Sequence, residues 1–451
     1  MKVAIIGTGY VGLVTGISLG VLGHEVTCVD YDKDKISMIN SAKSPFHEPN
    51  IDKYLKKVIK KKKLIASEDL DKAVFQADFI ILAVGTPTVD EKIDLSFIKK
   101  ASSQIGVAIK KSKKYQVVVV KSTVLPGVTS DIVGPILEKN SGKKLGSDFG
   151  LCMNPEFLRE GSALEDALNP DRIIVGSFDD KSTKQLTKLY KDISCPKIFT
   201  DIRTAELTKY AANALFATLI SYANEIARIS ENIPHVDVID VWKGVHLDKR
   251  FSPPKGKKLI RPGFLSYIHS GPGFGGSCFP KDVKALASFA TGLGIESKLI
   301  KSVIDINNTQ PQRIIYHLKN ALGKNLKNAK IAILGMAFKP NTDDTRESPS
   351  FPIIEKLVSE GVKVIAHDPM VQEKHLPEGY LNSSITLTSS LSQALENADA
   401  VIIITAWEEY IKLAPQFFKK LMKNPIVIDG RRIYDKHLFT KAGITYKGIG
   451  L

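Results

Sequence analysis

The sequence is poor in cysteine and has no long apolar run. Its four cysteines are Cys28, Cys152, Cys195 and Cys278, and no two of them have the Cys-x-x-Cys spacing of a zinc site or the pattern of a disulfide framework. No stretch approaches the length of a membrane span, and residues 3–6 lead directly into a glycine motif, which leaves no room for a signal peptide. We therefore expect a cytoplasmic protein without a metal site or a membrane partner.

Acidic residues are the minority among the charges, since 48 Asp and Glu oppose 63 Lys and Arg and give a net charge of +15. Such an excess can attract nucleic acid, a membrane surface or an anionic small substrate. Its densest part, residues 56–63, lacks the interleaved aromatic residues that single-strand binders use. We interpret this stretch as a solvated helix end and predict no nucleic-acid partner.

The N-terminal residues predict a dinucleotide site. Residues 2–6 are typical of a buried parallel strand, and Gly7, Gly9 and Gly12 follow at GxGxxG spacing before a helical stretch. Asp30 stands at the end of the next predicted strand. The glycines would admit a pyrophosphate to the helix N-terminus, while the carboxylate would bond a ribose hydroxyl and repel a 2′-phosphate. This pattern favours NAD over NADP.

Two more apolar runs, residues 79–84 and 117–120, predict parallel strands, and a threonine follows each of them. Ligands of open α/β sheets lie beyond the carboxyl ends of the strands, which places Thr86 and Thr123 near a cofactor or substrate. For Thr86, an ordinary helix cap is an equal alternative.

Two pairs of polar residues are spaced four apart. Glu156 and Glu160 lie in a predicted loop-to-helix turn, where they could be ordinary first-turn acids. Lys209 and Asn213 share one face of the longest helical pattern, which runs from Glu206 to about residue 232 and is apolar around much of its circumference. We expect this helix to be buried between domains or subunits. An ion pair with Glu206 is the alternative account of Lys209.

A glycine-rich stretch, residues 271–282, surrounds Cys278 and places Asp282 four residues after it. Glycines let the backbone approach a ligand closely, and a thiol in such a loop is a candidate nucleophile. A tight turn around a buried structural cysteine is the alternative.

The opening pattern returns after about residue 325. Residues 330–335, 361–368 and 398–403 repeat the first strand, the second strand with its terminal acid, and a third strand. The second copy lacks GxGxxG, so we expect it to bind something other than a complete dinucleotide, with Lys339 and Arg346 meeting a diphosphate. The predicted fold is α/β, with two Rossmann-like, doubly wound parallel-sheet domains joined by a helical central region that contains the long helix. The predicted domains are residues 1–200, 201–324 and 325–451.

Several motifs together resemble those of the nucleotide-sugar 6-dehydrogenases, the UDP-glucose/GDP-mannose dehydrogenase family. They are residues 7–12, 84–87, 122–127, 154–160, 273–282 and 344–348. The resemblance spans the chain and implies an NAD-dependent, four-electron oxidation of a sugar C6 alcohol to a carboxylate. It also implies a homodimer or a higher homo-oligomer, in agreement with the apolar helix.

The resemblance assigns roles to individual residues. Cys278 would attack the aldehyde formed by the first oxidation and carry a thiohemiacetal and then a thioester. The implied catalytic residues are Cys278, Lys209, Asn213, Asp282 and Thr123, with Glu156 or Glu160 activating the hydrolytic water and Glu156 the first choice.

The implied cofactor contacts are Gly7, Gly9, Tyr10, Val11, Gly12, Asp30, Lys35, Thr86, Thr123, Lys281 and Arg346. The implied substrate contacts are Glu156, Phe157, Leu158, Lys209, Asn213, Arg250, Tyr267, Gly275 and Lys339. The family supplies one arginine from a neighbouring subunit, and Arg250 matches that motif. A Pro/Lys-rich insertion follows Arg250 and makes Arg261 a competitor for that role.

We expect UDP-glucose to be the substrate. Enzymes for UDP-N-acetylhexosamines carry a His before the nucleophile, whereas this chain has Ser277. GDP-mannose is the alternative, since residues 122–127 also resemble its dehydrogenase, but residues 169–176 and 427–432 resemble the UDP-glucose enzymes. A protein that binds NAD and a nucleotide sugar without turnover is a further alternative, against which the intact Cys278 argues.

Overall fold

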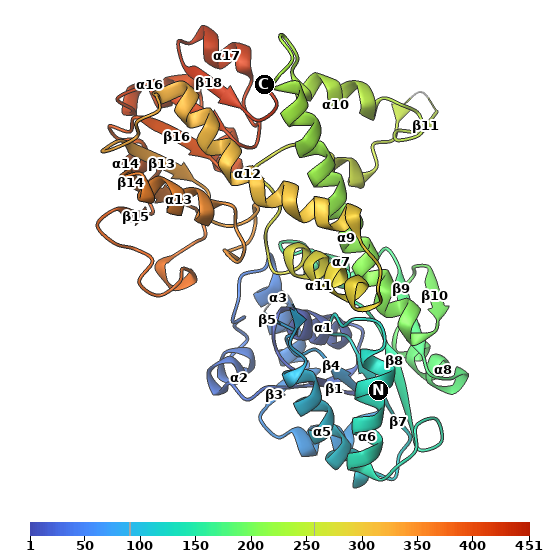
Figure 1. Ribbon diagram of the computed structural model, residues 1–451. Helices are drawn as coiled ribbons and strands as arrows, with labels where there is room; N and C mark the ends of the chain where they lie inside the picture. Colours follow the sequence, from blue (N-terminus) through green and yellow to red (C-terminus); the bar gives the residue numbers. More distant parts are fainter. Residues whose placement is uncertain (90–91, 257) are drawn as a thin grey trace. The chain divides into compact units, whose positions relative to one another are not determined.

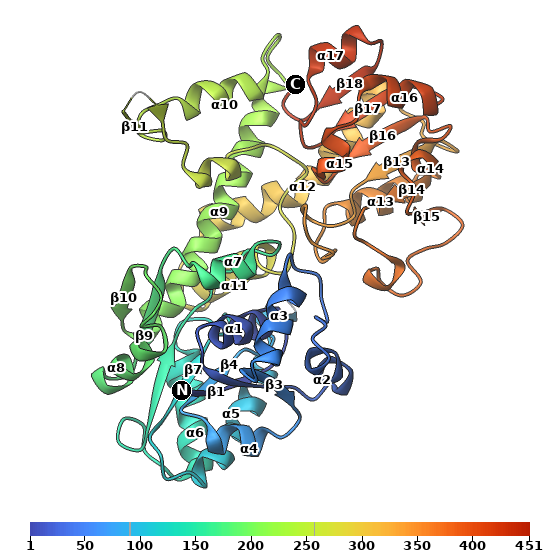
Figure 2. The same cartoon turned by 180° about the vertical axis from the view of Figure 1, so that it is seen from behind.

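The computed structural model describes residues 1–89, 92–256 and 258–451 and divides into two compact units, Met1–Ala212 and Asn213–Leu451 (Figures 1 and 2). Helix α9 (Ile202–Ser230) begins in unit 1 and ends in unit 2. It starts four residues before the predicted helix. Every helix in the described ranges is too short or too polar to cross a bilayer. The division into three domains stays a prediction.

Unit 1 contains an eight-stranded sheet with the order β10-β9-β8-β7-β4-β1-β2-β3. It is parallel as predicted, except that β8 and β9 pair in antiparallel. The last two residues of β8, Cys152 and Met153, pair with the last two of β9, Ser177 and Gly176, so the connecting residues 154–172 lie beyond the carboxyl end of β8. The strands are β1 (Lys2–Ile6), β2 (Glu25–Val29), β3 (Leu64–Ser67), β4 (Phe79–Leu82), β7 (Gln116–Val120), β8 (Phe149–Met153), β9 (Ile173–Ser177) and β10 (Lys197–Thr200), and a separate ribbon joins β5 (Thr88–Val89) to β6 (Lys92–Ile93).

Both faces of this sheet are covered, which explains why its central strands are apolar throughout. Within β4, Ile81 packs into the core on one face and Ile80 into the core on the other. The helices of unit 1 are α1 (Tyr10–Val21), α2 (Lys33–Asn40), α3 (Ile51–Lys60), α4 (Leu70–Gln76), α5 (Ser96–Lys110), α6 (Gly134–Ser141), α7 (Ala163–Leu168) and α8 (Asp180–Leu189), with a π-helical turn η1 (Val128–Val133).

The lysine-rich stretch forms the end of α3, as predicted. Ile51, Leu55 and Val58 are spaced four and three apart and are buried, whereas the lysines at 56, 57, 60, 61 and 62 are exposed. The charge therefore occupies the solvated face of an amphipathic helix.

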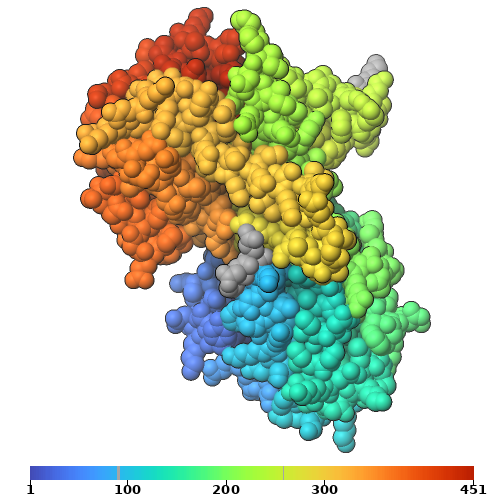
Figure 3. Space-filling view, viewed as in Figure 1, coloured from blue at the N-terminus to red at the C-terminus, as the bar shows by residue number. Residues whose placement is uncertain are grey.

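Unit 2 contains the predicted second sheet, with six parallel strands in the order β15-β14-β13-β16-β17-β18. Its strands are β13 (Lys330–Leu334), β14 (Lys363–His367), β15 (Ile385–Thr388), β16 (Ala400–Ile403), β17 (Ile426–Asp429) and β18 (Thr445–Gly448). Its helices are α10 (Val238–His246), α11 (Phe279–Gly292), α12 (Lys298–Leu322), α13 (Ser350–Ser359), α14 (Leu391–Leu395), α15 (Glu408–Ile411), α16 (Pro415–Leu421) and α17 (Lys436–Lys441), with short helices η2 (Gly263–Tyr267) and η3 (Glu373–His375). In the space-filling view, α12 (gold) lies on the surface of this unit (Figure 3).

The Pro/Lys-rich insertion, expected to be a loop, contains a short antiparallel pair. Its strands are β11 (Pro254–Lys255) and β12 (Lys258–Leu259). Lys257 lies outside the described residues.

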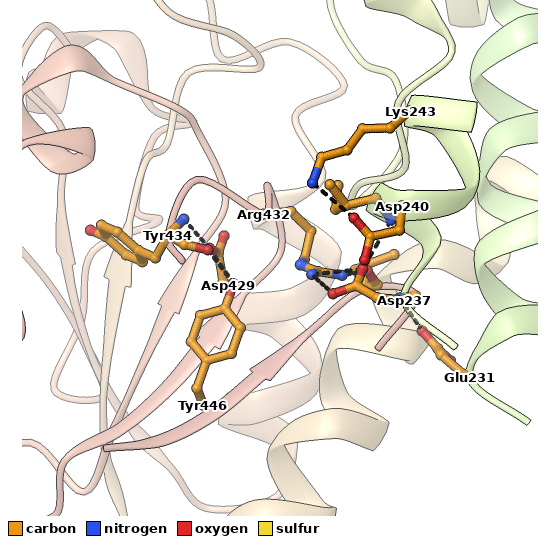
Figure 4. Close-up of polar contacts among 11 residues, drawn as sticks. Glu231, Asp237, Asp240, Lys243, Asp429, Arg432, Tyr434 and Tyr446 are labelled. Carbon is orange, nitrogen blue, oxygen red and sulfur yellow. Dashed lines mark hydrogen bonds and ion pairs between the residues drawn. The ribbon is translucent and has the colours of Figure 1, made fainter. Parts of the chain in front are cut away.

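The C-terminal strands of unit 2 are fastened to α9 and α10 by polar contacts (Figure 4). The Arg432 guanidinium donates to both carboxylate oxygens of Asp237, the residue that caps α10, at 2.9 and 2.7 Å. The backbone N–H of Gly450 donates to Glu231, just after α9, at 2.9 Å. Burial raises the pKa of Asp429, which accepts bonds from Tyr446 and from the Tyr434 backbone. The contacts of Arg432 and Gly450 hold the C-terminal part of the second sheet to the start of α10 and the end of α9.

Candidate active site

The first glycine turn is closed on one side and open on the other. Gly7 has a φ of +99°, and a Cβ there would lie 2.7 Å from the carbonyl oxygen of Ala83. A Cβ on Gly12 would lie 1.9 Å from the carbonyl oxygen of Gly7. At Gly9, which caps α1, a Cβ would meet no heavy atom of the described residues within 4 Å. The helix N-terminus is therefore accessible to a phosphate, whose charge it would stabilise.

Asp30 directly follows β2 and is an ionised hydrogen-bond acceptor. Its Oδ2 accepts from the Thr8 backbone at 2.8 Å and from the Thr8 hydroxyl at 2.5 Å, and its Oδ1 accepts from the backbones of Tyr31 and Asp32 at 2.9 and 3.1 Å. Burial raises the pKa of Asp30, but these bonds outweigh it and leave the pKa below its usual range. Of the groups that donate to Asp30, only the Thr8 hydroxyl can rotate away from the carboxylate. A ribose hydroxyl would therefore compete with the Thr8 hydroxyl for Asp30.

These residues fit a dinucleotide, because an open helix N-terminus lies beside a carboxylate acceptor. Tyr10 and Val11 form the first turn of α1, and Lys35 pairs with Asp32 at 3.6 Å. Thr86 does not cap α5, which Leu95 precedes; its hydroxyl donates to the carbonyl oxygen of Thr123 at 3.0 Å. The carboxyl ends of β4 and β7 are thereby joined. The helix-cap alternative for Thr86 is wrong.

Glu156 and Lys209 form a buried ion pair. The Lys209 Nζ lies 3.0 Å from the Glu156 Oε1, and the two side chains are 4% and 6% exposed. Burial raises the pKa of Glu156, but the Lys209 ammonium and the Leu158 backbone N–H outweigh it and leave the pKa below its usual range. Glu206 instead accepts from the backbone N–H groups of Gly127 and Thr129. An ionised carboxylate beside a cation can accept a proton from water.

Glu160 lies in different surroundings, near the first glycine turn. Its negative charge contributes to raising the pKa of Tyr10, after burial and the bond to Glu48. The buried Glu48 carboxylate accepts from the Tyr10 hydroxyl and from the backbones of Gly161 and Ala163, the latter two at 2.7 and 2.8 Å. Sequence reasoning missed Glu48, because it belongs to no motif that we had recognised. It joins the glycine turn to the loop that carries the candidate acids.

Lys121 is a second missed residue. Its Nζ donates to the Oδ1 and the carbonyl oxygen of Asn154 at 2.9 and 3.3 Å, and the Tyr190 hydroxyl donates to the same Oδ1 at 2.7 Å. Burial lowers the pKa of Lys121 to about 8. These groups border a cavity of about 70 Å³ that Glu156 and Phe157 also line. The position of Lys121, at the end of β7 just before Ser122 and Thr123, was the signal that could have revealed it.

Arginine and lysine surround the Phe157 ring. The Arg172 guanidinium lies 3.7 Å from the ring centroid and the Lys209 ammonium 5.4 Å from it. Leu158 follows with its backbone bonded to Glu156. This cationic neighbourhood suits an oxygen-rich, anionic ligand.

In unit 2, Cys278 occupies the N-cap position of α11 and Pro280 lies in the first turn. Its Sγ lies 3.6 Å from the Ser277 Oγ. Cys278 is only partly buried, whereas Cys28 and Cys152 are fully buried, so the alternative of a buried structural cysteine is wrong. A helix N-terminus stabilises negative charge, which suits a thiolate nucleophile.

Asp282 lies one turn into α11 and is 2% exposed. Its Oδ2 accepts from the Asn213 amide at 2.6 Å, and its Oδ1 lies 2.5 Å from the Lys281 Nζ. The structure therefore brings together three of the predicted residues of unit 2, namely Asn213, Lys281 and Asp282.

The remaining predicted residues of unit 2 are more scattered. The Tyr267 ring lies 4.3 Å from the Phe216 ring of α9 in a tilted arrangement, and the Lys339 ammonium lies 5.5 Å from the centroid of the Phe338 ring. Arg346 pairs with Asp344 at 2.7 Å. Arg250 pairs with Asp248 and its side chain is 84% exposed, and Arg261 is exposed as well. Both arginines are accessible from outside the unit.

Comparisons with known proteins agree over the whole chain. Models of the NAD binding domain, the central domain and the UDP binding domain of the UDP-glucose/GDP-mannose dehydrogenase family match residues 1–194, 203–309 and 332–436. The chain is 37% identical to the UDP-glucose 6-dehydrogenase YwqF of Bacillus subtilis, with 100% of this chain and 98% of that protein covered.

Solved structures of related dehydrogenases are similar to this one. A UDP-glucose dehydrogenase from the archaeon Pyrobaculum islandicum superimposes with a TM-score of 0.88 at 35% identity, covering 100% of this chain and 97% of that chain. A UDP-D-ManNAc dehydrogenase from Pyrococcus horikoshii gives 0.85 at 29% identity, covering 100% and 99%.

Proposed function

The chain belongs to the UDP-glucose/GDP-mannose dehydrogenase family of NAD-dependent nucleotide-sugar 6-dehydrogenases, and we propose that it oxidises the C6 alcohol of UDP-glucose to the carboxylate of UDP-glucuronate. One observation carries the proposal: a partly buried thiol, Cys278, begins α11, and one turn later Asp282 is bonded to Asn213. A dehydrogenase that forms a carboxylate needs such a nucleophile. The full-length similarity to a UDP-glucose 6-dehydrogenase supports the choice of sugar.

The first oxidation removes a hydride from C6 and a proton from its hydroxyl. NAD, when bound, supplies the hydride acceptor. Lys209 and Asn213 lie four residues apart on α9 and therefore on one face, and we assign them to the C6 oxygen. Asp282 orients the Asn213 amide through the bond at 2.6 Å.

The second oxidation requires Cys278. An aldehyde has no readily transferable hydride until a nucleophile makes its carbon tetrahedral. The thiolate forms an S–C bond to C6, the oxygen gains a proton, and a thiohemiacetal results. Loss of a hydride, for which a second NAD would be the acceptor, and of a proton leaves a thioester, and attack by water then breaks the C–S bond. The products are the carboxylate and the free thiol.

We assign activation of the hydrolytic water to Glu156, assisted by Thr123. Glu156 is ionised and lies 3.0 Å from the Lys209 ammonium, which can support the oxyanion as it forms. Glu160 lies beside Tyr10, and we assign it to positioning the cofactor loop.

We assign the remaining contacts by family resemblance and charge. Phe157 and Leu158 frame the sugar, Gly275 lets the loop approach it, and Tyr267 and Lys339 meet the diphosphate. Lys281 and Arg346 contact the cofactor. Arg250, with Arg261 as its competitor, reaches a neighbouring copy.

Substrate choice is tested by comparing nucleotide sugars. We expect kcat/KM for UDP-glucose to exceed that for GDP-mannose by roughly a hundredfold or more, because buried groups that match uracil are left unpaired by guanine. NADH absorbance under identical NAD concentrations gives the rates. Equal or reversed kcat/KM values would contradict UDP-glucose as the preferred substrate.

A homodimer is part of the proposal. Leu215, Tyr222 and Ile229 lie seven residues apart on one face of α9 and are 58%, 52% and 52% exposed. Such a stripe is typical of an interface between helices of two copies. Sedimentation equilibrium at micromolar concentration should give about twice the mass of one chain, and Tyr222→Glu should lower it. A monomeric wild type would contradict this part.

A further inference from the structure

The loop that precedes Cys278 is held by three side-chain amides. The Gly271 N–H donates to the Asn224 Oδ1 at 2.8 Å, and the Gly271 carbonyl accepts from the Gln310 Nε2 at 2.7 Å. Three residues later, Asn307 accepts from the Phe274 N–H at 2.7 Å and donates to the Phe274 carbonyl at 3.1 Å. Asn224 belongs to α9 and the other two amides belong to α12, and we name these three residues the amide clamp.

Asn307 of the amide clamp binds both the N–H and the C=O of one residue, Phe274. A carboxamide donates and accepts at once and carries no charge, so it can satisfy an N–H and a C=O of the same residue. The two bonds from Asn307 fix the orientation of Phe274 as well as its position. An ionised carboxylate of similar size could accept from the Phe274 N–H but could not donate to the carbonyl.

Two glycines of the loop leave no room for a side chain, because the amide clamp or neighbouring backbone lies against them. Gly273 has a φ of +108°, and a Cβ there would lie 2.8 Å from the Asn307 Oδ1. A Cβ on Gly275 would lie 2.2 Å from the Glu347 carbonyl oxygen. The loop is therefore packed against its supports on both sides and cannot shift without losing contacts.

Phe274 connects the amide clamp to the nucleophile. Its side chain is 8% exposed and packs with Val283 of α11 and Val303 of α12. Its ring also meets the ring of Phe279, the residue after Cys278, at 6.1 Å in an edge-on arrangement. A displacement of Phe274 would reach Cys278 through both contacts.

We infer that Asn307 is a positioning residue that holds Phe274 so that Cys278 stands at the start of α11 in attacking geometry, with Asn224 and Gln310 fixing the beginning of the same loop. The inference rests on the proposed role of Cys278. Since only the second oxidation uses the thiol, loss of the amide clamp affects that step and spares the first. The aldehyde then escapes before it is captured.

The test compares Asn307→Ala with Asn308→Ala, the neighbouring exposed asparagine of the same helix. Each enzyme is given NAD and UDP-glucose with hydroxylamine, and the trapped aldehyde oxime and the carboxylate are counted by mass spectrometry. Separately, the rate of iodoacetamide labelling is measured for the peptide of Cys278, with the peptide of Cys195 in unit 1 as internal reference. The labelling requires no substrate.

For Asn307→Ala we expect oxime in place of much of the carboxylate. Labelling of Cys278 should be slower by roughly tenfold, because a thiol displaced from the N-terminus of α11 loses the stabilisation of its thiolate. Asn308→Ala should behave as wild type, and Cys195 should label equally in all three. Asn307→Asp keeps the acceptor for the Phe274 N–H and should lie between, and it replaces the alanine variant if that variant does not fold.

Labelling of Cys278 within twofold of wild type, or faster than wild type, in Asn307→Ala would overturn the inference, as would an undiminished yield of carboxylate. If the wild-type enzyme oxidises no UDP-glucose, the proposed function fails, but the labelling comparison still decides the role of the amide clamp. The two failures are therefore distinguishable.

Discussion

Two glycine-rich turns of this chain use the same residue type for opposite purposes. In the first, residues 7–12, a Cβ on Gly9 would meet nothing within 4 Å among the described residues. In the second, residues 271–276, a Cβ on Gly275 would lie 2.2 Å from a backbone oxygen and one on Gly276 2.7 Å from the Phe338 ring. The first turn leaves backbone open for a ligand. The second packs backbone tightly so that a side chain, Cys278, is held in place.

The turn after β13 corresponds to the first glycine turn in the second sheet, but its backbone N–H groups already have hydrogen-bond partners. The backbone N–H groups of Met336 and Ala337 donate to Asp368 at 2.8 and 3.0 Å, and Trp407 donates to the same oxygen. Asp368 is 4% exposed, whereas Asp30 is only partly buried. Asp30 also binds its turn, through Thr8, but Asp368 is more deeply buried and accepts from Trp407 as well, which supports the expectation that this half does not take a complete dinucleotide.

The largest effect should follow a change to the side chain that the second turn presents. Cys278→Ser keeps the size of the residue but replaces the thiol by a much weaker nucleophile, and we expect carboxylate formation to fall by about a thousandfold or more. Quantitative mass spectrometry of the products measures it, with Cys195→Ser as the matched control. Wild-type turnover by Cys278→Ser would contradict the proposal that the second turn positions a nucleophile.

An alanine placed in each turn tests the comparison directly. Gly9→Ala should leave the thermal unfolding midpoint unchanged, because its Cβ points into open space, but should raise the Kd of NAD by roughly tenfold or more by obstructing the phosphate. Gly275→Ala should leave the Kd of NAD unchanged but lower the free energy of unfolding by about 1–3 kcal/mol, since its Cβ overlaps a carbonyl oxygen.

Calorimetry for NAD binding and thermal melts on both variants give the comparison. If Gly9→Ala destabilised the protein as much as Gly275→Ala does, or if Gly275→Ala weakened NAD binding as much, the distinction between an open and a packed turn would be lost.

A smaller effect should follow removal of the acid beside the first turn. Asp30→Ala removes both the acceptor for the ribose and the charge that repels a 2′-phosphate, so the ratio of kcat/KM for NAD over NADP should fall by roughly tenfold. Initial rates with each cofactor measure the ratio. An unchanged ratio would show that Asp30 only ends its strand.

The smallest effect concerns acid stability. The pKa of Asp30 in the folded protein lies below its ordinary value of 3.8, so its bonds to Thr8 stabilise the fold above that value and are lost as the pH falls through the folded pKa. The stability of wild type over Asp30→Asn should therefore be greatest near neutral pH and shrink toward about pH 3. Urea midpoints at a series of pH values test this. A difference that grows in acid would contradict the direction of the shift.

Much of the fold could be predicted because it depends on local patterns. The apolar runs of β1, β4 and β13 are buried on both faces and followed by glycine or threonine, which marks parallel strands and their ligand edge. The antiparallel direction of β9 could not be read, because a buried apolar run looks the same in either direction.

Site residues that belong to sequence motifs could be predicted. Residues whose partners lie far away in the sequence were missed or given the wrong partner. Spacing suggested Glu206 for Lys209, yet its partner is Glu156, 53 positions away in the sequence. Glu48 and Asn307 are single polar residues outside the recognised motifs. Their importance comes from the backbone groups that they bind, and only the fold shows these.

The central claim is a four-electron oxidation of UDP-glucose through Cys278, and the most direct test is to count cofactor against product. With limiting UDP-glucose and excess NAD, the account predicts two NADH for each UDP-glucuronate and no free aldehyde. One NADH per sugar with an aldehyde product would contradict the thiol mechanism, and NADH formation only with another nucleotide sugar would contradict the assignment of the substrate.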